Sequence, residues 1–332
     1  MLILPKREYS KMPIIPSSFT GNRLLKNGHA ETIIPALFRK VSIAYNRERV
    51  ILQDGDFIDV DWQKQGSKKV LVLFHGLEGS SQSQYIKGFS RFFYDKGYDT
   101  CAVNFRSCSG EMNKLLRSYN SGVSDDIDEV LNHISKNNLY GEMYLCGFSL
   151  GGNALLKYLG EQSNNVFSLI KKAAAFSVPI DLAGSSKVLA KPSNKVYMKR
   201  FLNSLNAKMK QKSLMIPGSI DVKGIEKIKT FGEWDSKFTA PIHGYKDSAD
   251  YYAKCNALQF LPHIRIRTLL VNAQNDPFLS ESCFAYNEAK VNPYFHFEAP
   301  KYGGHVGFSM ALPNGPYWSE KKCFDFFEGV EN

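Results

Sequence analysis

One pentapeptide constrains the fold of this chain more than any other feature: Gly-Phe-Ser-Leu-Gly at residues 147–151. It follows the apolar run 143–146 and precedes residues 152–159, whose pattern is typical of a helix. A serine at the apex of such a strand–turn–helix unit lies on a strained backbone with its hydroxyl pointing out of the sheet, where it can attack a carbonyl carbon. Glycine is expected on both sides because a Cβ there would collide with a neighbouring strand or helix. We therefore predict that Ser149 is a nucleophile.

Predicted strands and helices alternate along most of the chain. Residues 70–74 form a continuous apolar run, which is typical of a strand covered on both faces. The pattern predicts further strands at 48–54, 57–62, 100–105, 143–146, 173–178, 268–272 and 294–297, with helices at 84–96, 124–134, 152–159, 281–290 and 317–327. The first 45 residues contain four prolines and are expected to be irregular. These observations predict an α/β fold with a mostly parallel central sheet of about eight strands flanked by helices.

The alternation lapses after the sixth predicted strand. We expect an N-terminal arm at 1–45, a core at 46–180 and 241–332, and a basic cap insertion at 181–240. The insertion holds twelve Lys or Arg and five Asp or Glu, and thus most of the net charge of +10. Tyr197, Phe201, Leu202, Leu205 and Met209 have the spacing of one helix face.

This basic helix has two interpretations. It either contacts an anionic membrane or a lipid, or it covers the pocket with its apolar face while its lysines are merely solvated. We prefer the second, because lysine stems routinely cover apolar surface. The charge lies mainly in the insertion and no known nucleic-acid motif is present, so nucleic acid is not expected as a partner.

A serine nucleophile needs a base, and the base needs a third group that fixes its tautomer. In a strand–elbow–helix fold the chain order is Ser, then Asp or Glu, then His. Asp276 lies just beyond the predicted strand 268–272, and His305 lies after the last predicted strand in the glycine-rich loop 303–307. Because open α/β sheets place their chemistry at the carboxyl ends of strands, we predict that Ser149, Asp276 and His305 form a catalytic triad.

An attacked carbonyl becomes an oxyanion that needs two backbone N–H donors. One is expected from Leu150, the residue after the nucleophile. The second is expected from Leu77, in the glycine-containing turn 75–79. His75 in the same turn is expected to form hydrogen bonds within the turn rather than to act as a second base.

The chain resembles the YheT-like branch of the α/β-hydrolases, which includes plant embryogenesis-associated proteins, yeast medium-chain ethyl ester synthase/esterases and animal lipid hydrolases. The resemblance extends from about residue 20 to the end, and residues 75–81, 104–111, 119–122, 147–153, 276–278 and 27–33 carry it. It implies hydrolysis of carboxylic esters of acyl chains without a metal or organic cofactor, with the triad at the three positions given above.

This sequence departs from the family pattern at three positions. Ser107 and Asn120 stand where the family usually has Gly and His, and Asn275 stands where it often has a second Asp. None of the three belongs to the predicted triad, but the first two are expected to alter the pocket. The H-x4-D pattern that is associated with acyl transfer is also missing.

We therefore expect a serine carboxylesterase that acts on a small-molecule acyl ester of short to medium chain length or lipid-like character. Two alternatives remain: an alcohol or thiol acyltransferase on the same scaffold, and a non-catalytic ligand-binding module. The six cysteines have no CxxC spacing, the start of the chain does not fit a secretory signal, and no apolar run reaches membrane-spanning length. A cytoplasmic location is expected, and the oligomeric state is left open.

Overall fold

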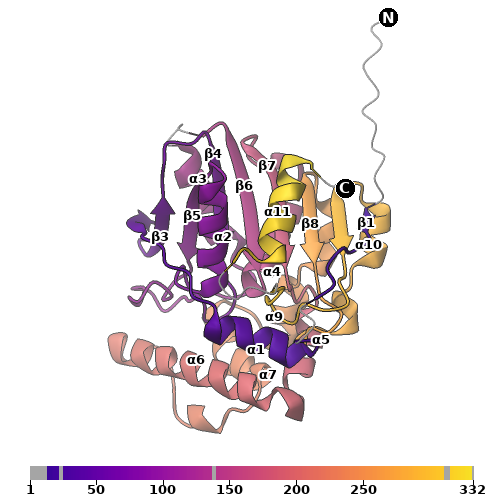
Figure 1. Cartoon of the computed structure of the whole chain (residues 1–332). Helices are drawn as coiled ribbons and strands as arrows, with labels where there is room; N and C mark the ends of the chain where they lie inside the picture. The colour runs from indigo at the N-terminus through magenta and orange to yellow at the C-terminus, as the bar shows by residue number, and fades with distance from the viewer. Residues whose placement is uncertain (1–12, 22–24, 137–139, 310–314, 331–332) are drawn as a thin grey trace, which may run out of the picture.

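The computed structural model describes residues 13–21, 25–136, 140–309 and 315–330. A nine-stranded sheet forms its centre, in the order β1-β9-β8-β7-β6-β4-β5-β3-β2 (Figure 1). The strands are β1 (Ile14–Ile15), β2 (Asn46–Ile51), β3 (Phe57–Gln63), β4 (Lys69–Phe74), β5 (Asp99–Asn104), β6 (Glu142–Phe148), β7 (Ile170–Phe176), β8 (Arg267–Val271) and β9 (Phe295–Glu298). Among the described strands, only the pairings β2–β3 and β3–β5 are antiparallel. The prediction of a mostly parallel sheet is confirmed, and the strand missed from the sequence is the two-residue β1 at the edge.

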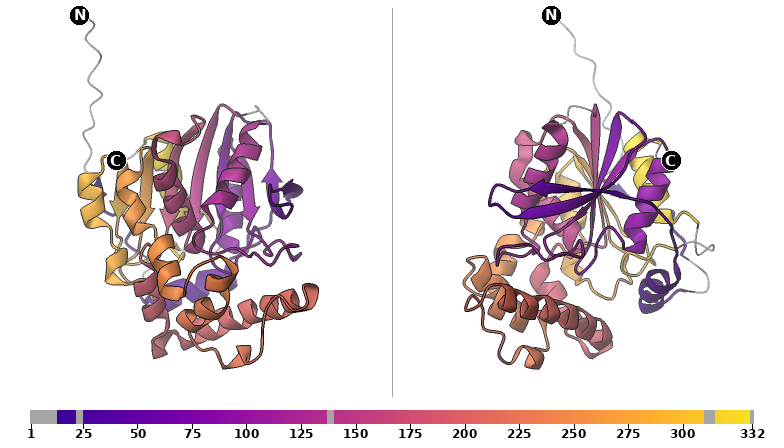
Figure 2. Two further views of the ribbon diagram at one scale, coloured as in Figure 1. Left: turned by 180° about the vertical axis from the view of Figure 1, so that it is seen from behind. Right: turned by 90° about the vertical axis from the view of Figure 1, so that its left-hand side faces the viewer.

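Helices cover both faces of the sheet. Helices α2 (Gln84–Asp95) and α11 (Trp318–Glu328) lie on one face, and α3 (Ser124–Lys136) and α4 (Leu150–Gln162) lie on the other (Figure 2). The side chains of strand β4 alternate between the two apolar cores, one on each face of the sheet. Its residues Val70, Val72 and Phe74 pack with α3 and α4, whereas Leu71 and Leu73 pack with α2 and α11. The apolar run of β4 is continuous because both faces are buried.

The expectation of an irregular N-terminal region is wrong for α1 (Gly28–Phe38). The side chain of Asn27 accepts hydrogen bonds from the backbone N–H groups of His29 and Ala30, which caps the start of this helix. Of the four prolines, only Pro35 lies inside the helix. The prolines were therefore a poor guide to this region, because a capped first turn and packing against α2 hold the helix in place.

A helical segment, residues 182–263, connects β7 to β8 and lies across the carboxyl ends of the strands (Figure 1). It consists of α5 (Leu182–Leu189), α6 (Lys195–Met215), α7 (Phe231–Trp234), the π-helical turn Asp235–Thr239, α8 (Ala240–Ile242) and α9 (Ser248–Cys255), with 3-10 turns at Pro192–Asn194, Ile225–Lys227 and Leu258–His263. It has a small apolar core of its own, made by Met198, Leu202, Leu205, Met209, Ile225, Trp234 and Phe238.

The remaining elements complete the carboxyl-terminal half of the core. A 3-10 turn (Ser163–Asn165) follows α4, and a second 3-10 turn (Glu281–Cys283) and α10 (Tyr286–Val291) connect β8 to β9. In the part of the chain described, no helix combines the length and the apolar character that crossing a bilayer requires.

Candidate active site

Ser149 occupies the sharp turn between β6 and α4, with a backbone φ of 51°. This is the left-handed region, which is strained for a residue with a side chain. A Cβ on Gly147 would lie 2.7 Å from the Cα of Gly152, and a Cβ on Gly151 would lie 2.3 Å from the carbonyl oxygen of His75. Both contacts are with backbone atoms that cannot move aside, so the two glycines are required for the steric reason predicted from the sequence.

His305 connects Ser149 to Asp276. Its Nε2 lies 2.9 Å from Ser149 Oγ, and its Nδ1 lies 2.8 Å from Asp276 Oδ2. Because the carboxylate can only accept, Nδ1 carries the proton and Nε2 accepts from the serine hydroxyl. The side chain of Asp276 is fully buried and that of His305 is 10% exposed. The structure therefore brings the three predicted residues together in the hydrogen-bonded order that activates a serine.

Asp276 is itself fixed by the turn that follows β8. Its Oδ1 accepts a hydrogen bond from the backbone N–H of Phe278 at 2.9 Å. The Phe278 ring in turn packs on the His305 imidazole, with 4.3 Å between the ring centres. One short loop thus orients both the carboxylate and the imidazole.

Helix α1 holds the loop that carries His305, which the sequence analysis did not anticipate. Thr32 Oγ1 accepts from the backbone N–H of His305 at 2.9 Å. The buried carboxylate of Glu31 accepts from the side chain of Asn275 at 2.6 Å and from the N–H of Gly303 at 3.0 Å. Asn275, where the family often has Asp, uses both ends of its amide here, because its oxygen accepts from the N–H of Gly304. The segment 27–33 carried part of the family resemblance, and that was the available signal.

Three backbone N–H groups of the turn 75–79 donate hydrogen bonds within the fold. The N–H of Gly76 donates to Tyr85, that of Glu78 to Tyr119, and that of Gly79 to the carbonyl of Gly76. Within the residues that the structure describes, the Leu77 N–H has no acceptor.

Leu150 supplies the second predicted donor position. It is the first residue of α4, so its N–H precedes the hydrogen-bonded part of the helix. Leu77 and Leu150 line the same pocket as Ser149. The geometry is therefore consistent with the predicted pair of oxyanion donors.

His75 forms hydrogen bonds within the fold, as the sequence analysis expected. Its Nδ1 lies 2.7 Å from the carbonyl oxygen of Gly76, and its Nε2 accepts from the backbone N–H of Phe105. Complete burial lowers the pKa of His75 to about 4. It is therefore neutral near pH 7, with both ring nitrogens engaged in holding the turn.

Glu78 connects this turn to the helical segment. Its carboxylate accepts from Lys208 Nζ at 2.9 Å and from the Tyr119 hydroxyl at 2.7 Å, and also from the Ser204 hydroxyl. Lys208 and Ser204 belong to α6, so a long-range ion pair joins α6 to the residue next to Leu77. No sequence motif indicates this contact.

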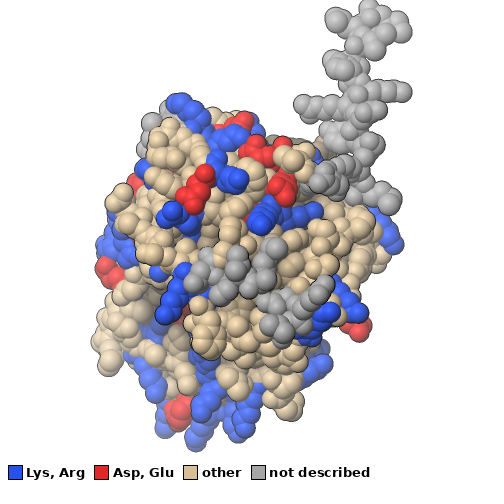
Figure 3. All heavy atoms as spheres, in the orientation of Figure 1, with Lys and Arg blue, Asp and Glu red and all other residues tan. Residues whose placement is uncertain are grey.

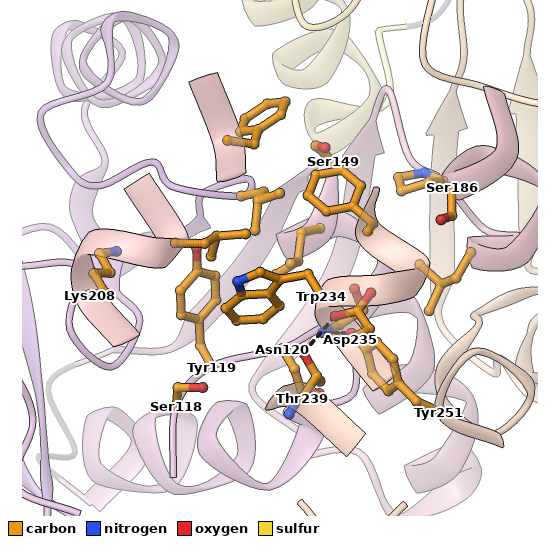
Figure 4. A pocket seen from close by; sticks show the side chains of 18 of the residues that line it. Ser118, Tyr119, Asn120, Ser149, Ser186, Lys208, Trp234, Asp235, Thr239 and Tyr251 are labelled. Carbon is orange, nitrogen blue, oxygen red and sulfur yellow. Dashed lines mark hydrogen bonds between the residues drawn. The ribbon is translucent and has the colours of Figure 1, made fainter. Parts of the chain in front are cut away.

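A pocket of about 130 Å³ opens beside Ser149 (Figure 4). Most of its lining side chains are apolar or aromatic, and many come from the helical segment. Its apolar and aromatic lining residues are Leu77, Met112, Tyr119, Leu150, Pro179, Leu182, Leu189, Phe201, Leu205, Met209, Phe231, Trp234, Tyr251, Tyr252 and Phe278. Such a lining suits an acyl chain or another apolar group.

The described residues include no group of three or more His, Cys, Asp or Glu side chains that could hold a metal ion. All six cysteines are buried and free.

Comparison with known proteins shows which family the chain is similar to. Residues 65–290 match the profile of the family described as "Serine aminopeptidase, S33". The chain is 33% identical over 318 residues to the "Putative esterase YheT" of Escherichia coli, which covers 93% of both chains. It is 28% identical over 309 residues to "Phospholipase ABHD3" of Mus musculus, covering 89% of this chain and 74% of the relative. It is also 28% identical over 265 residues to "Monoacylglycerol lipase" of Saccharomyces cerevisiae, covering 77% and 58%.

Solved structures agree on the fold. An esterase of Pyrococcus furiosus, Pf2001, superposes with a TM-score of 0.59 at 16% sequence identity, over 88% of this chain and 96% of that one. At this level of identity the similarity concerns the α/β-hydrolase fold alone.

Proposed function

The chain belongs to the YheT-like branch of the α/β-hydrolases, and on this premise we propose that it is a serine carboxylesterase that uses Ser149, His305 and Asp276. The main support is the continuous hydrogen-bonded series from Asp276 through His305 to Ser149 at an apolar pocket. Relatives whose names describe an esterase, a phospholipase and a lipase support the same class of reaction.

In the proposed acylation step, Ser149 Oγ attacks the ester carbonyl carbon while its proton passes to His305 Nε2. Asp276 stabilises the imidazolium that forms. The negative charge on the former carbonyl oxygen is stabilised by the backbone N–H groups of Leu77 and Leu150. The tetrahedral intermediate then breaks its bond to the alcohol oxygen, and His305 gives the proton to the departing alcohol.

Deacylation repeats these steps with water as the nucleophile. His305 removes a proton from water as the water oxygen attacks the acyl carbon, and the bond to Ser149 Oγ breaks. The proton returns to the serine and the carboxylic acid leaves. An alcohol or thiol in place of water would make the same enzyme an acyltransferase, so the second nucleophile alone separates these two activities.

The helical segment is proposed to act as a cap that selects the substrate, with the boundaries 181–240 predicted from the sequence extended to the last helical turn at His263. Its apolar side chains in the pocket support an acyl ester of short to medium length or a lipid-like ester. The names of the mouse and yeast relatives support a lipid-like substrate as well.

Peripheral contact with an anionic membrane remains a prediction. Helix α6 carries Lys and Arg side chains but no Asp or Glu, and blue side chains gather at the lower end of the view in Figure 3, over the helical segment. However, Lys208 is paired with Glu78, and the buried Lys212 donates to the carbonyl oxygen of Asn113 at 2.6 Å. Two of the basic side chains of α6 therefore serve the fold rather than a surface.

A chain-length series of p-nitrophenyl esters tests the proposed function. The wild type is expected to hydrolyse them with a distinct length optimum, and Ser149→Ala is expected to lose at least about 10³-fold in kcat. Ser193→Ala, an exposed serine of the helical segment, is the matched control and should retain full activity. Wild-type activity that survives Ser149→Ala would sink the proposal.

Two further measurements separate the alternatives. A fluorophosphonate probe should label Ser149 in the folded wild type, and no labelling together with no turnover would favour a non-catalytic module. Products formed with ethanol in competition with water distinguish hydrolysis from acyl transfer, because the acid dominates only if water is the preferred second nucleophile.

A further inference from the structure

The pocket beside Ser149 is not uniformly apolar. In Figure 4, Asn120, Asp235 and Thr239 lie together, apart from Ser149, while Trp234 and Tyr119 line the wall. The reaction proposed above uses none of these polar side chains. Their hydrogen bonds indicate which chemical group this part of the pocket receives.

Asp235 is a carboxylate without a basic partner. Its Oδ1 accepts from the hydroxyl of Thr239 at 2.5 Å, and its Oδ2 accepts from the hydroxyl of Tyr252 at 2.6 Å. Among the described residues, no Lys, Arg or His lies within ion-pair distance of it. A carboxylate has room for about four hydrogen bonds, so acceptor capacity remains. Asp235 also begins a π-helical turn, a distortion that is frequent at functional sites.

Asn120 supplies the complementary group. Its side chain lines the pocket and the residue is only 6% exposed. The Oδ1 atom accepts from the backbone N–H of Gly122 at 2.7 Å, which fixes the amide with Nδ2 on the other side. In the part of the chain that the structure describes, Nδ2 has no hydrogen-bond acceptor. Nδ2 does not belong to the buried atoms that lack a partner, so this donor is accessible from the pocket, where a ligand can accept from it.

The residues before and after Asn120 in the sequence form hydrogen bonds with the helical segment, which carries Asp235. His243 lies 2.8 Å from the carbonyl oxygen of Ser118 and 2.8 Å from that of Thr239. The Thr239 side chain in turn binds Asp235.

The second attachment lies on the other side of Asn120. The N–H of Ser121 donates to the hydroxyl of Tyr251 at 2.8 Å, and Tyr251 lines the same pocket. Asn120 and Asp235 thus belong to one polar region of the lining.

An amide donor and a carboxylate acceptor together suit a hydroxyl group, which both accepts and donates. A methyl group would leave both side chains unsatisfied, and an ammonium group could not accept from the amide. We propose that Asn120 and Asp235 form a subsite for a hydroxyl group of the ester substrate, at a distance from the reacting carbonyl. This proposal rests on the proposed esterase function. The hydroxyl belongs either to the acyl chain or to the alcohol part.

The first experiment measures binding without turnover. In the Ser149→Ala protein, 1-octanol is expected to bind about ten-fold more tightly than 1-fluorooctane by calorimetry. The two molecules have the same chain length, but only the hydroxyl both accepts from an amide and donates to a carboxylate. Asp235→Leu should abolish the difference and Asn120→Leu should reduce it. Since no chemistry occurs, this result is independent of whether the esterase proposal holds.

The second experiment identifies the source of the hydroxyl. Wild-type kcat/KM is compared for p-nitrophenyl alkanoates with and without a terminal hydroxyl, over several chain lengths. It is also compared for octanoate esters of hexane-1,6-diol and 1-hexanol. A preference of about ten-fold in the first pair assigns the hydroxyl to the acyl chain, and in the second pair to the alcohol.

Controls separate the subsite from folding and from general charge effects. Glu226→Gln removes one exposed negative charge from the same helical segment and should leave the preference for 1-octanol over 1-fluorooctane unchanged. Asp235→Asn keeps the shape and one acceptor, so it should keep part of the preference. Equal binding of 1-octanol and 1-fluorooctane in the Ser149→Ala protein, unaltered by Asp235→Leu, would overturn the subsite even if ester hydrolysis is demonstrated.

Discussion

Lys208 of helix α6 donates a 2.9 Å hydrogen bond to Glu78, the residue that follows Leu77 in the turn beside Ser149. The Glu78 carboxylate is 7% exposed, and its backbone N–H donates to Tyr119. Glu78 has a φ of 55°, in the left-handed region of backbone conformation, which is energetically unfavourable for a residue with a side chain. The ion pair from the helical segment therefore stabilises the turn that orients the Leu77 N–H.

Replacing either partner of this ion pair should lower kcat more than it changes KM. We expect about a 10- to 100-fold loss in kcat for Glu78→Gln and Lys208→Met, because a displaced Leu77 N–H stabilises the oxyanion less well. Steady-state kinetics on a p-nitrophenyl ester measure the effect. Lys210→Met, an exposed lysine on the same helix, is the control. If both variants retain the wild-type kcat, the ion pair has no role in positioning the turn.

The contacts of α1 lead to a second prediction. Thr32→Val keeps the side-chain shape but removes the oxygen that accepts from the His305 N–H, so the loop should move and kcat should fall about 10-fold. Glu31→Leu should have a comparable effect, because it removes the oxygen that accepts from Asn275 and Gly303. The measurement is kcat together with the rate of fluorophosphonate labelling.

Ile33→Ala provides the matched control for α1, since Ile33 is 37% exposed. It should leave kcat unchanged. If it lowers kcat as much as Thr32→Val does, the effect reflects the stability of α1 and not the hydrogen bond to His305.

Whether a structural feature could be predicted from the sequence depends on whether its physical cause lies within one short segment of the chain. The position of Ser149 could be predicted because the strand, the turn glycines and the helix are adjacent in the chain. The structure confirms the steric reason for the two glycines. Asp276 and His305 followed from chain order and from their position at strand ends. These causes are local or follow from chain order, which explains why the sequence could predict three residues that the structure brings together.

Contacts between segments that are distant in the sequence could not be predicted in this way. Helix α1 was missed because its prolines suggested irregular structure, whereas its cap and its contacts with the His305 loop stabilise it. Asn120 was noted as a departure from the family, but its proximity to the segment of Asp235 depends on the folding of the helical segment. Neither periodicity nor motif spacing carries such information.

The glycines beside Ser149 lead to a third prediction, on stability. Gly151→Ala should destabilise the protein by about 1 to 3 kcal/mol, because its Cβ would contact the backbone oxygens of His75 and Phe74. Urea unfolding measures the change. Gly232→Ala is the control, since a Cβ there meets nothing within 4 Å. Equal effects at the two glycines would contradict the steric argument for the serine turn.

The last prediction concerns the pH dependence of stability. Burial raises the pKa of the Asp235 carboxyl from 3.8 to about 6. As pH rises from about 4 to about 6, the unfolded chain loses this proton before the folded protein does, so the carboxyl reduces the stability of the folded state over this window. Asp235→Asn does not titrate.

The free energy of unfolding of Asp235→Asn, relative to wild type, should therefore increase by about 1 to 3 kcal/mol between about pH 4 and about pH 7.5. Changes in hydrogen bonding to Thr239 and Tyr252 add an offset to this difference. The other titrating groups are common to both proteins and cancel. Urea unfolding at several pH values gives the slope. A difference that is independent of pH would mean that the Asp235 carboxyl has an ordinary pKa, and that the pocket solvates its charge without help from a ligand.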